Sequence, residues 1–533
     1  MNLRSFVWLA VGPTILTVLF AMYPRPARGQ SGNDWRQLQR DPGRTGYCPQ
    51  AVRAPFRARW VWFGSDWVLR SKDSGASEPK WKDDLRSRED HSYRMPASVP
   101  FSFASSMQPI VAAGRVFVAD VQGRVYAIDA DDGTTIWTAD NPGGSLWSGT
   151  ADEKIVVFAS VLGCVTAFSA STGQPLWQVD TRKAITSAPC SVGEVMYVAS
   201  QSGHVYAVRA SDGEVLWKSS YLGAGIQGGL CWHKGRIYTG TEAMEAVAID
   251  AGTGKVVTKR KLMGQSFRFV WPVAVKDRVI FTTVPIICVG SEYVNDPVLA
   301  GRPGQAVGWD PKLKPGYANV SEEQQALRRW LAGRGKYWQT CFALRAETLE
   351  RDYIVATGAT EGCGTPPEPP VVDDQGRPLL WWATAHPMLT NPDAFGTNFS
   401  VDISAIDLAT GERAVIDNGR LAGQTTETDN LYGMTVGSDM LYLRQNFRGT
   451  YCINLKNSEG HRISAVYRYR DQGGWPAAIN YAQGQIKGSW GPKVVRVPDT
   501  PPAPSSGRVG PSIACGRLFF TENFCLTCVE TGE

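Results

Sequence analysis

The stretch GRVYAIDADDGTTIW, from Gly123 to Trp137, recurs forty residues later as GCVTAFSASTGQPLW and after forty more as GHVYAVRASDGEVLW. Four turns, DADDG, SASTG, RASDG and DAGTG, end in glycines spaced by 40, 40 and 41 residues, namely Gly133, Gly173, Gly213 and Gly254. A fixed period of this length is typical of propellers, solenoids and other repeat arrays. The chain is therefore expected to stack one small unit many times.

Each period has the pattern of β-strands and no helical periodicity. Val, Ile, Tyr and Phe dominate the runs PIVAAGRVFVAD and GRVYAIDA, which short turns separate. Val125 and Ala127 point to one face of the second run, and Tyr126 and Ile128 to the other, so both faces are apolar. A sheet buried on both faces needs two neighbours, which four-stranded blades stacked around an axis supply.

A tryptophan follows each of the first three turn glycines by four residues. The glycines allow the chain to take positive φ where it reverses. We expect the tryptophans to wedge between adjacent blades, each truncation to alanine costing roughly 3–5 kcal/mol. These residues are Trp137, Trp177 and Trp217.

The combined pattern resembles the PQQ-like (pyrroloquinoline quinone-like) repeat of quinoprotein alcohol dehydrogenases and BamB-type outer-membrane assembly factors. The opening DWRQLQRD, from Asp34 to Asp41, resembles the segment before the first blade in exported bacterial members. The resemblance covers about residues 34–533 and is strong over 109–261. It implies an all-β fold, an eight-bladed β-propeller of four-stranded antiparallel blades built on a tryptophan-docking motif.

Degraded copies of the repeat extend the count to eight blades, with seven as the alternative. The last copy ends at Glu533, one residue past its turn glycine, so its outermost strand and its tryptophan are missing. A strand over about 55–63, which contains Trp60, is expected to complete that blade. Closing the ring in this way removes an open sheet edge.

The first 29 residues have the pattern of an export signal. Basic Arg4, the apolar run from Phe6 to Met22 and the small residues Ala27 and Gly29 predict cleavage near Gly29. An uncleaved anchor is the alternative, because about 17 apolar residues is the short limit of a membrane span. The mature chain, 30–533, is then one exported propeller domain, periplasmic or extracellular, with no further transmembrane span.

The charge of the chain argues against nucleic-acid binding. The formal net charge is +5, and three arginines leave with the signal. The mature chain is therefore close to neutral, and no basic stripe of the kind that nucleic-acid binders carry is present in the sequence.

Long segments interrupt the repeat at about 70–107, 286–337, 386–398 and 468–508. Segments of this length often carry function. Aromatic residues in and beside them either present a stacking surface for a sugar, a quinone or a peptide, or pack the insertions onto the blades. The candidate surface residues are Trp330, Trp338, Trp381, Trp382, Trp475 and Trp490.

Eleven cysteines are an odd number for an exported chain, so at least one stays unpaired or pairs with a partner. Cys341 and Cys363, which bracket the turn of the fifth blade, are the candidate disulfide. The pair Cys525 and Cys528 lies in a predicted strand, where residues three apart face opposite ways, so no metal site is predicted. The expected buried thiols are Cys190, Cys231, Cys452 and Cys515.

The sequence contains no serine nucleophile elbow, phosphate-binding glycine loop or zinc-protease helix. The resemblance implies, for its dehydrogenase members, PQQ on the propeller axis with a calcium ion held by Glu, Asn and sometimes Asp. No such ligand set can be placed by motif, and the chain has no adjacent cysteine pair. The sequence favours a non-catalytic monomer that serves as a binding or assembly platform for a protein or polysaccharide partner at the cell envelope. A PQQ- and calcium-dependent alcohol or sugar dehydrogenase is the alternative.

Overall fold

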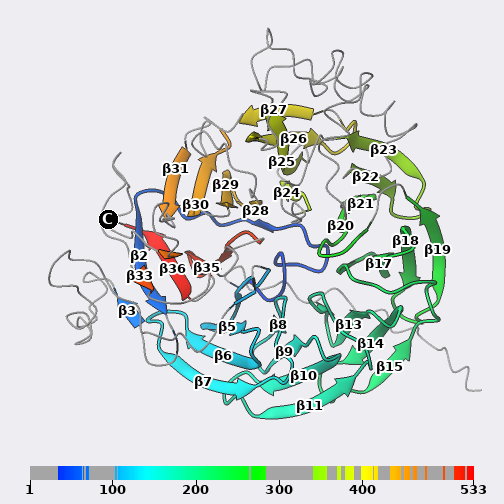
Figure 1. Cartoon of the computed structure of the whole chain (residues 1–533), viewed down its shortest axis with the longest axis horizontal. Coiled ribbons are helices and arrows are strands. Elements are labelled where there is room, and N and C mark those ends of the chain that lie inside the picture. The colour runs from blue at the N-terminus through cyan, green and yellow to red at the C-terminus, as the bar shows by residue number, and fades with distance from the viewer. Residues whose placement is uncertain are drawn as a thin grey trace, which may run out of the picture.

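In the computed structural model the chain forms a closed ring of eight β-sheets around a central axis (Figure 1). No helix among the described residues is long and apolar enough to cross a membrane. The predicted signal peptide, 1–29, and most of the predicted insertions lie outside the described residues. The structure describes residues 34–62, 64, 68–70, 103–104, 106–262, 266–283, 340–356, 369–373, 379–388, 398–411, 413–417, 432–445, 449–456, 460–464, 475–476, 496–497, 509–522 and 525–532.

The first four blades are regular copies of four antiparallel strands, ordered from the axis to the rim (Figure 1). Blade one comprises β4 (Ile110–Ala112), β5 (Arg115–Ala119), β6 (Arg124–Asp129) and β7 (Thr135–Asp140). Blade two comprises β8 (Thr150–Ala151), β9 (Ile155–Ala159), β10 (Cys164–Ser169) and β11 (Pro175–Asp180). Blade three comprises β12 (Cys190–Val192), β13 (Val195–Ser200), β14 (His204–Arg209) and β15 (Val215–Lys218). Blade four comprises β16 (Leu230–His233), β17 (Arg236–Thr241), β18 (Glu245–Asp250) and β19 (Val256–Lys261).

The next three blades keep the same order although their sequences have diverged. Blade five comprises β20 (Val273–Val275), β21 (Arg278–Thr282), β22 (Thr340–Arg345) and β23 (Arg351–Ala356). Blade six comprises β24 (Val371–Asp373), β25 (Leu379–Met388), β26 (Asn398–Asp407) and β27 (Arg413–Asp417). Blade seven comprises β28 (Tyr432–Gly437), β29 (Met440–Gln445), β30 (Gly449–Asn454) and β31 (Gly460–Ser464). A separate pair, β32 (Trp475–Pro476) and β33 (Arg496–Val497), precedes blade eight in the sequence.

Blade eight is built from both ends of the chain. Its inner strands are β34 (Ser512–Ala514), β35 (Arg517–Glu522) and β36 (Cys525–Thr531), and β2 (Phe56–Trp62) pairs antiparallel with β36. The predicted closing strand and the count of eight blades are therefore confirmed, and the alternative of seven is wrong. The sequence did not predict β3 (Val68–Arg70), which pairs with β2 as a fifth strand.

The blades are buried on both faces, as the sequence predicted. Val125, Tyr126, Ala127 and Ile128 of β6 are all at most 4% exposed. The outermost strand is different, because every second residue of β7 is exposed and only Trp137 is buried. Apolar packing between neighbouring blades thus forms the core, and the rim strands are the surface.

The described cysteines include both buried and exposed residues. Cys190, Cys231 and Cys452 are buried as predicted, whereas Cys515 is exposed. The prediction for Cys515 is wrong because this residue lies in the turn between β34 and β35, where its φ is +52°. The candidate disulfide stays a prediction, because Cys341 is buried in β22 but Cys363 lies outside the described residues.

Candidate functional site

The repeated tryptophans lie at the junctions between blades. A Cβ built on Gly173 of blade two would come within 2.5 Å of the Trp137 ring of blade one. The Trp137 Nε1 also donates a hydrogen bond of 3.0 Å to the carbonyl oxygen of Ala170. Only glycine in this left-handed turn leaves room for the indole, so each blade receives the tryptophan of the blade before it.

Three further junctions repeat this arrangement. Their glycines would each bring a Cβ within 2.8 Å of the preceding ring, and the indole N–H groups donate to alanine carbonyl oxygens at 3.0–3.2 Å. The sets are Trp177 with Gly213 and Ala210, Trp217 with Gly254 and Ala251, and Trp60 with Gly133 and Ala130. Because these indoles are committed to packing, they position blades and offer no ligand site.

Two junctions in the diverged half use other residues. Tyr353 stands where the tryptophan would be in blade five, packs on Gly411, and donates from its hydroxyl to the Leu408 carbonyl oxygen at 2.7 Å. Between blades four and five, Thr258 replaces the tryptophan and Leu349 replaces the turn glycine. Leu349 is fully buried at a φ of +57°. A large residue in the turn thus accompanies a small one on the rim strand.

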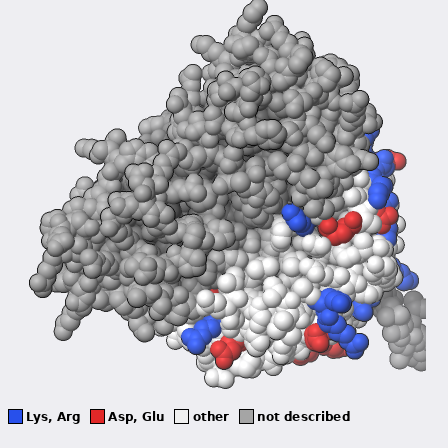
Figure 2. Space-filling view, in the orientation of Figure 1, with Lys and Arg blue, Asp and Glu red and all other residues white. Residues whose placement is uncertain are grey.

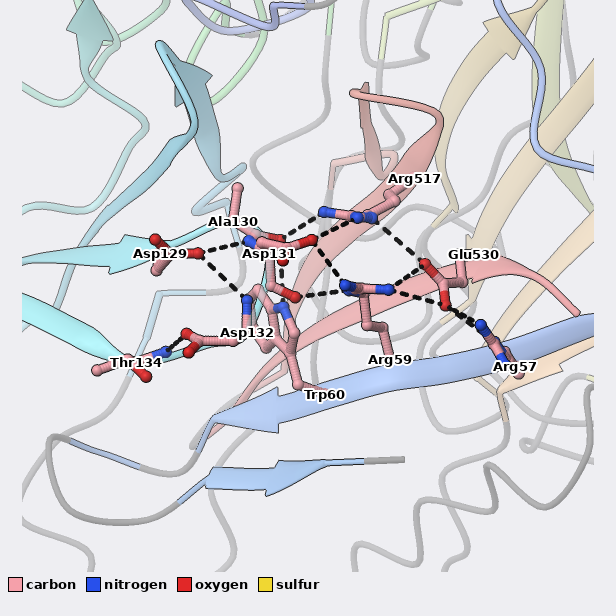
Figure 3. Close-up of polar contacts among 10 residues, drawn as sticks. All are labelled: Arg57, Arg59, Trp60, Asp129, Ala130, Asp131, Asp132, Thr134, Arg517 and Glu530. Carbon is pink, nitrogen blue, oxygen red and sulfur yellow. Dashed lines mark hydrogen bonds and ion pairs between the residues drawn. The ribbon is translucent and has the colours of Figure 1, made fainter. Parts of the chain in front are cut away.

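A charged cluster surrounds the ring closure (Figure 3). Asp131, in the turn after β6, accepts from Arg59 of β2 and Arg517 of β35 at 2.7 Å each. Glu530 of β36 pairs with Arg57 at 2.8 Å and with Arg59 at 3.1 Å. Burial alone would raise the pKa of Asp131, but the hydrogen bonds and charges of Arg517 and Arg59 lower it below its ordinary value. The cluster joins the first and last blades.

The centre of the ring is occupied by the residues from Asp34 to Cys48, which we call the axial strap; Figure 1 shows it as blue chain crossing the middle. Backbone hydrogen bonds of 2.7–2.9 Å link it to six blades. They join Trp35 to Val111, Arg36 to Ala151, Pro42 to Trp232, Gly43 to Ala274, Thr45 to Val372 and Gly46 to Val436.

Side chains of the axial strap reach the two remaining blades. Gln37 donates to the Ser191 carbonyl oxygen at 3.2 Å and accepts from the Ser191 amide at 3.0 Å, in blade three. The Cys48 Sγ lies 3.8 Å from the Ile513 carbonyl oxygen of blade eight. Strand β1 (Tyr47–Cys48) also pairs parallel with β28. The axial strap therefore contacts the innermost strand of all eight blades.

Arg44 is a deeply buried charged side chain of the axial strap, at 1% exposed. Its guanidinium donates to four carbonyl oxygens at 2.8–3.3 Å, those of Leu38, Ala188, Pro189 and Leu230. Burial lowers the pKa of this group, and the neighbouring Cys190, Cys231 and Asp41 act in the opposite direction. A planar group with five donors suits such a set of backbone acceptors.

Two indoles complete the filling of the centre. Trp147 precedes β8 of blade two and Trp271 precedes β20 of blade five, and their ring centroids are 5.5 Å apart at 86°. These rings are 4% and 2% exposed. Neither N–H group has a hydrogen-bond partner within the described part of the chain. Residues from blades well separated in the ring thus meet at its centre.

The described residues do not fit PQQ with a calcium ion. Among them, no three His, Cys, Asp or Glu side chains lie close enough together to hold a metal. The axis, where the resemblance places the quinone, contains the axial strap and the Trp147–Trp271 pair. Within the described residues, packing groups occupy this part of the axis.

The predicted surface aromatics divide into two groups. Trp381 is 3% exposed within the core of blade six, so the prediction of a binding-surface role is wrong for this residue. It lies in β25, and its side chain belongs to an apolar cluster that includes residues of the neighbouring blades. The other candidates lie outside the description, because only the backbone is described for Trp382 and Trp475 and nothing is described for Trp330, Trp338 and Trp490.

The rim carries a feature that the sequence reasoning missed. On each of the first four blades an exposed aliphatic residue occupies the position before the tryptophan or its replacement, and the four are 39–50% exposed. They are Ile136, Leu176, Leu216 and Val257, which we call the rim row. The signal was present in the repeat as the apolar residue that precedes each docking position.

The charge beside the rim row changes sign along the ring. The exposed charged residues at the ends of β7 and β11 are acidic, Asp140 and Asp180, whereas those of β15 and β19 are basic, Lys218, Lys259, Arg260 and Lys261. Figure 2 shows both signs of charge along the described rim. Basic residues therefore follow Leu216 and Val257 on their strands, although Glu214 precedes Leu216 and its side chain is 60% exposed.

Comparisons with known proteins agree with the repeat and the ring. Residues 73–225, 121–270 and 201–293 match the family model described as outer membrane protein assembly factor BamB, and this matched part is less than half of the chain. No curated protein matches the sequence.

Two solved structures of low identity are similar to this chain over much of its length. The quinohemoprotein alcohol dehydrogenase from Comamonas testosteroni is 12% identical, with 95% of this chain and 82% of that one covered and a TM-score of 0.50. BamB from Moraxella catarrhalis is 14% identical over 62% of this chain and 76% of its own, with a TM-score of 0.38. At these identities the likeness concerns the fold alone. The chain is an eight-bladed β-propeller with PQQ-like repeats.

Proposed function

We propose that this chain is a non-catalytic, exported propeller that binds a protein partner at the cell envelope. The observation that carries the proposal is the rim row, with exposed aliphatic residues at one repeat position on four consecutive blades. Exposed apolar side chains that recur in a line on a soluble surface favour an interaction site. The predicted export signal supports the location.

The chemistry of the rim favours a protein over a polysaccharide. Sugar recognition uses exposed aromatic rings, but the exposed large hydrophobic residues of the described chain are aliphatic apart from Tyr221. Aliphatic side chains flanked by charge suit a protein surface of complementary charge. Because the charged residues that follow Leu216 and Val257 on their strands are basic, the partner is expected to present acidic and apolar side chains there.

Site-specific photo-crosslinking in the producing cell tests this proposal. A photoreactive residue at position 216 or 257 should yield one discrete protein adduct, because basic residues follow both positions on their strands. Positions 136 and 176 are matched controls, since they have the same place in the repeat but acidic neighbours. Equal adducts at all four positions, or no adduct at any of them, would contradict the proposed surface. Retention of the chain on a polysaccharide, with no protein adduct, would show that the partner is a polysaccharide and not a protein.

The dehydrogenase alternative has its own test. The chain from residue 30 is purified, and its ultraviolet-visible spectrum, bound-ligand mass and melting temperature are measured with and without added PQQ and Ca²⁺. The proposal expects no stoichiometric quinone and no change in melting temperature, because the axial strap and the Trp147–Trp271 pair fill the axis. A bound quinone at one equivalent would overturn the non-catalytic assignment.

A further inference from the structure

We infer that the axial strap is a lock: it holds all eight blades from the inside, so that the inner strands are protected together and are released together. This inference does not depend on the proposed function. It begins from the inner edge of each blade, where the innermost strand has no neighbouring strand on the axial side other than β1 of the axial strap itself, which lies beside β28. Such an edge leaves backbone N–H and C=O groups without ladder partners.

The axial strap supplies partners to these edges in the order of the ring. Its residues Trp35, Pro42, Gly43, Thr45 and Gly46 bond in turn to blades one, four, five, six and seven. Fifteen residues of one chain therefore satisfy edges that belong to units far apart in the sequence. Withdrawal of the segment would expose several edges in one event.

The backbone of the axial strap shows that the assembled ring imposes its conformation. Gln39, Arg40 and Arg44 have φ values of +53°, +72° and +62°. Residues with side chains rarely adopt this region and stay in it only where the surroundings enforce it. The segment is thus expected to have no stable conformation of its own before the blades are in place.

The fit between the axial strap and the inner strands is close. A Cβ built on Gly46 would lie 2.7 Å from Val371 Cγ1 of β24, and one built on Gly43 would lie 2.8 Å from the Ala274 carbonyl oxygen of β20. Arg44 adds a polar anchor, because its four acceptors come from the strap itself and from the inner segments of blades three and four. Steric fit and hydrogen bonds therefore fix one position of the segment.

The same stretch of chain then leaves the axis and becomes the closing strand. Only residues 49–55 separate the axial strap from β2, and Val52 bonds through its amide to the Tyr442 hydroxyl at 2.7 Å. Displacement of the segment is thus coupled mechanically to the strand that closes blade eight. One N-terminal region secures the ring at its centre and at its rim.

Hydrogen exchange of the full mature chain tests the lock, with Gly46→Ala as the variant and Gly516→Ala as its matched control. Both glycines have left-handed φ, +67° and +70°, but nothing lies within 4 Å of a Cβ on Gly516. We expect Gly46→Ala to raise the exchange rates of the Ala274, Val372 and Val436 amides together, by about tenfold or more. Gly516→Ala should leave these three rates unchanged.

Arg44→Lys is the second variant and covers the case in which Gly46→Ala does not fold. It keeps the charge but loses the planar set of donors, so the same joint rise is expected. Faster exchange confined to Val372 and Val436, beside the substituted glycine, would overturn the lock and leave a local packing contact. Unchanged exchange at all three amides in Arg44→Lys would overturn it as well.

Discussion

The Trp137 indole of blade one lies against Gly173 of blade two, so close that a Cβ on the glycine would come within 2.5 Å of the ring. The same relation links Trp60 of the closing strand to Gly133 of blade one. The same type of tryptophan–glycine contact therefore joins successive blades and also joins the first and last blades where the ring closes.

Gly173→Ala is expected to destabilise the fold more than Gly114→Ala. Both glycines have a φ of +73°, so the backbone strain from an added Cβ is matched, but nothing lies within 4 Å of a Cβ on Gly114. The additional loss for Gly173→Ala should be about 1–3 kcal/mol, the usual cost of overpacking. Urea unfolding of the two variants measures it. Equal losses would show that the indole moves aside without cost.

Trp137→Ala should lower the free energy of unfolding by about 3–5 kcal/mol, because the truncation removes a large side chain that is 9% exposed. Trp137→Phe keeps most of the apolar contact but loses the hydrogen bond to Ala170. The lost hydrogen bond should lower the free energy of unfolding by about 1 kcal/mol, in addition to the loss from the smaller apolar contact. Thermal and urea unfolding of both variants give the order. An unchanged melting temperature for Trp137→Ala would contradict the role of the indole as a wedge.

The junction between blades four and five predicts a coupled pair of substitutions. Thr258→Trp alone should destabilise by about 1–3 kcal/mol, because the buried Leu349 side chain stands where the turn glycine would leave room. Leu349→Gly alone should cost about 2–5 kcal/mol through loss of buried side chain. The double variant recreates the arrangement of Trp217 and Gly254, so the losses should not add. Additive losses in a double-mutant cycle would show that the two positions are independent.

Asp131→Asn is expected to weaken the ring closure in a pH-dependent way. The pKa of Asp131 in the folded chain lies below its ordinary value, so its contribution to stability is complete above the unfolded value of about 3.9. This contribution is lost as pH falls through the lower folded pKa. The melting temperatures of wild type and variant should therefore differ above about pH 4 and converge below it.

The effect should be small, because the Asp131 side chain is 66% exposed and solvent screens the pair. Asp180→Asn is the control, since it removes a rim carboxylate away from the ring closure. If the melting temperatures of Asp131→Asn and wild type differed by the same amount across the acid range, the effect of the substitution would not come from the charge of Asp131.

Local repetition made much of the ring accessible to sequence reasoning. The spacing of Gly133, Gly173, Gly213 and Gly254 defines the blade, and the apolar residues on both faces of β6 require neighbours on both sides. Even the closing strand follows from the unfinished last copy. These features depend on residues close together in the chain, so their periodicity can be read directly from the sequence.

The tertiary structure alone decided what fills the axis and what the rim exposes. The axial strap has no repeat, and its partners lie in eight different blades, so no spacing in the sequence connects Arg44 with Leu230 or Gly46 with Val371. Trp381 was expected at a surface and is buried, because composition identifies an aromatic residue but not the neighbours that cover it. The sequence by itself determined the unit and how often it recurs. Closure of the ring decided which residues meet at its centre, because contacts between residues so far apart in the sequence form only once all the blades are in place.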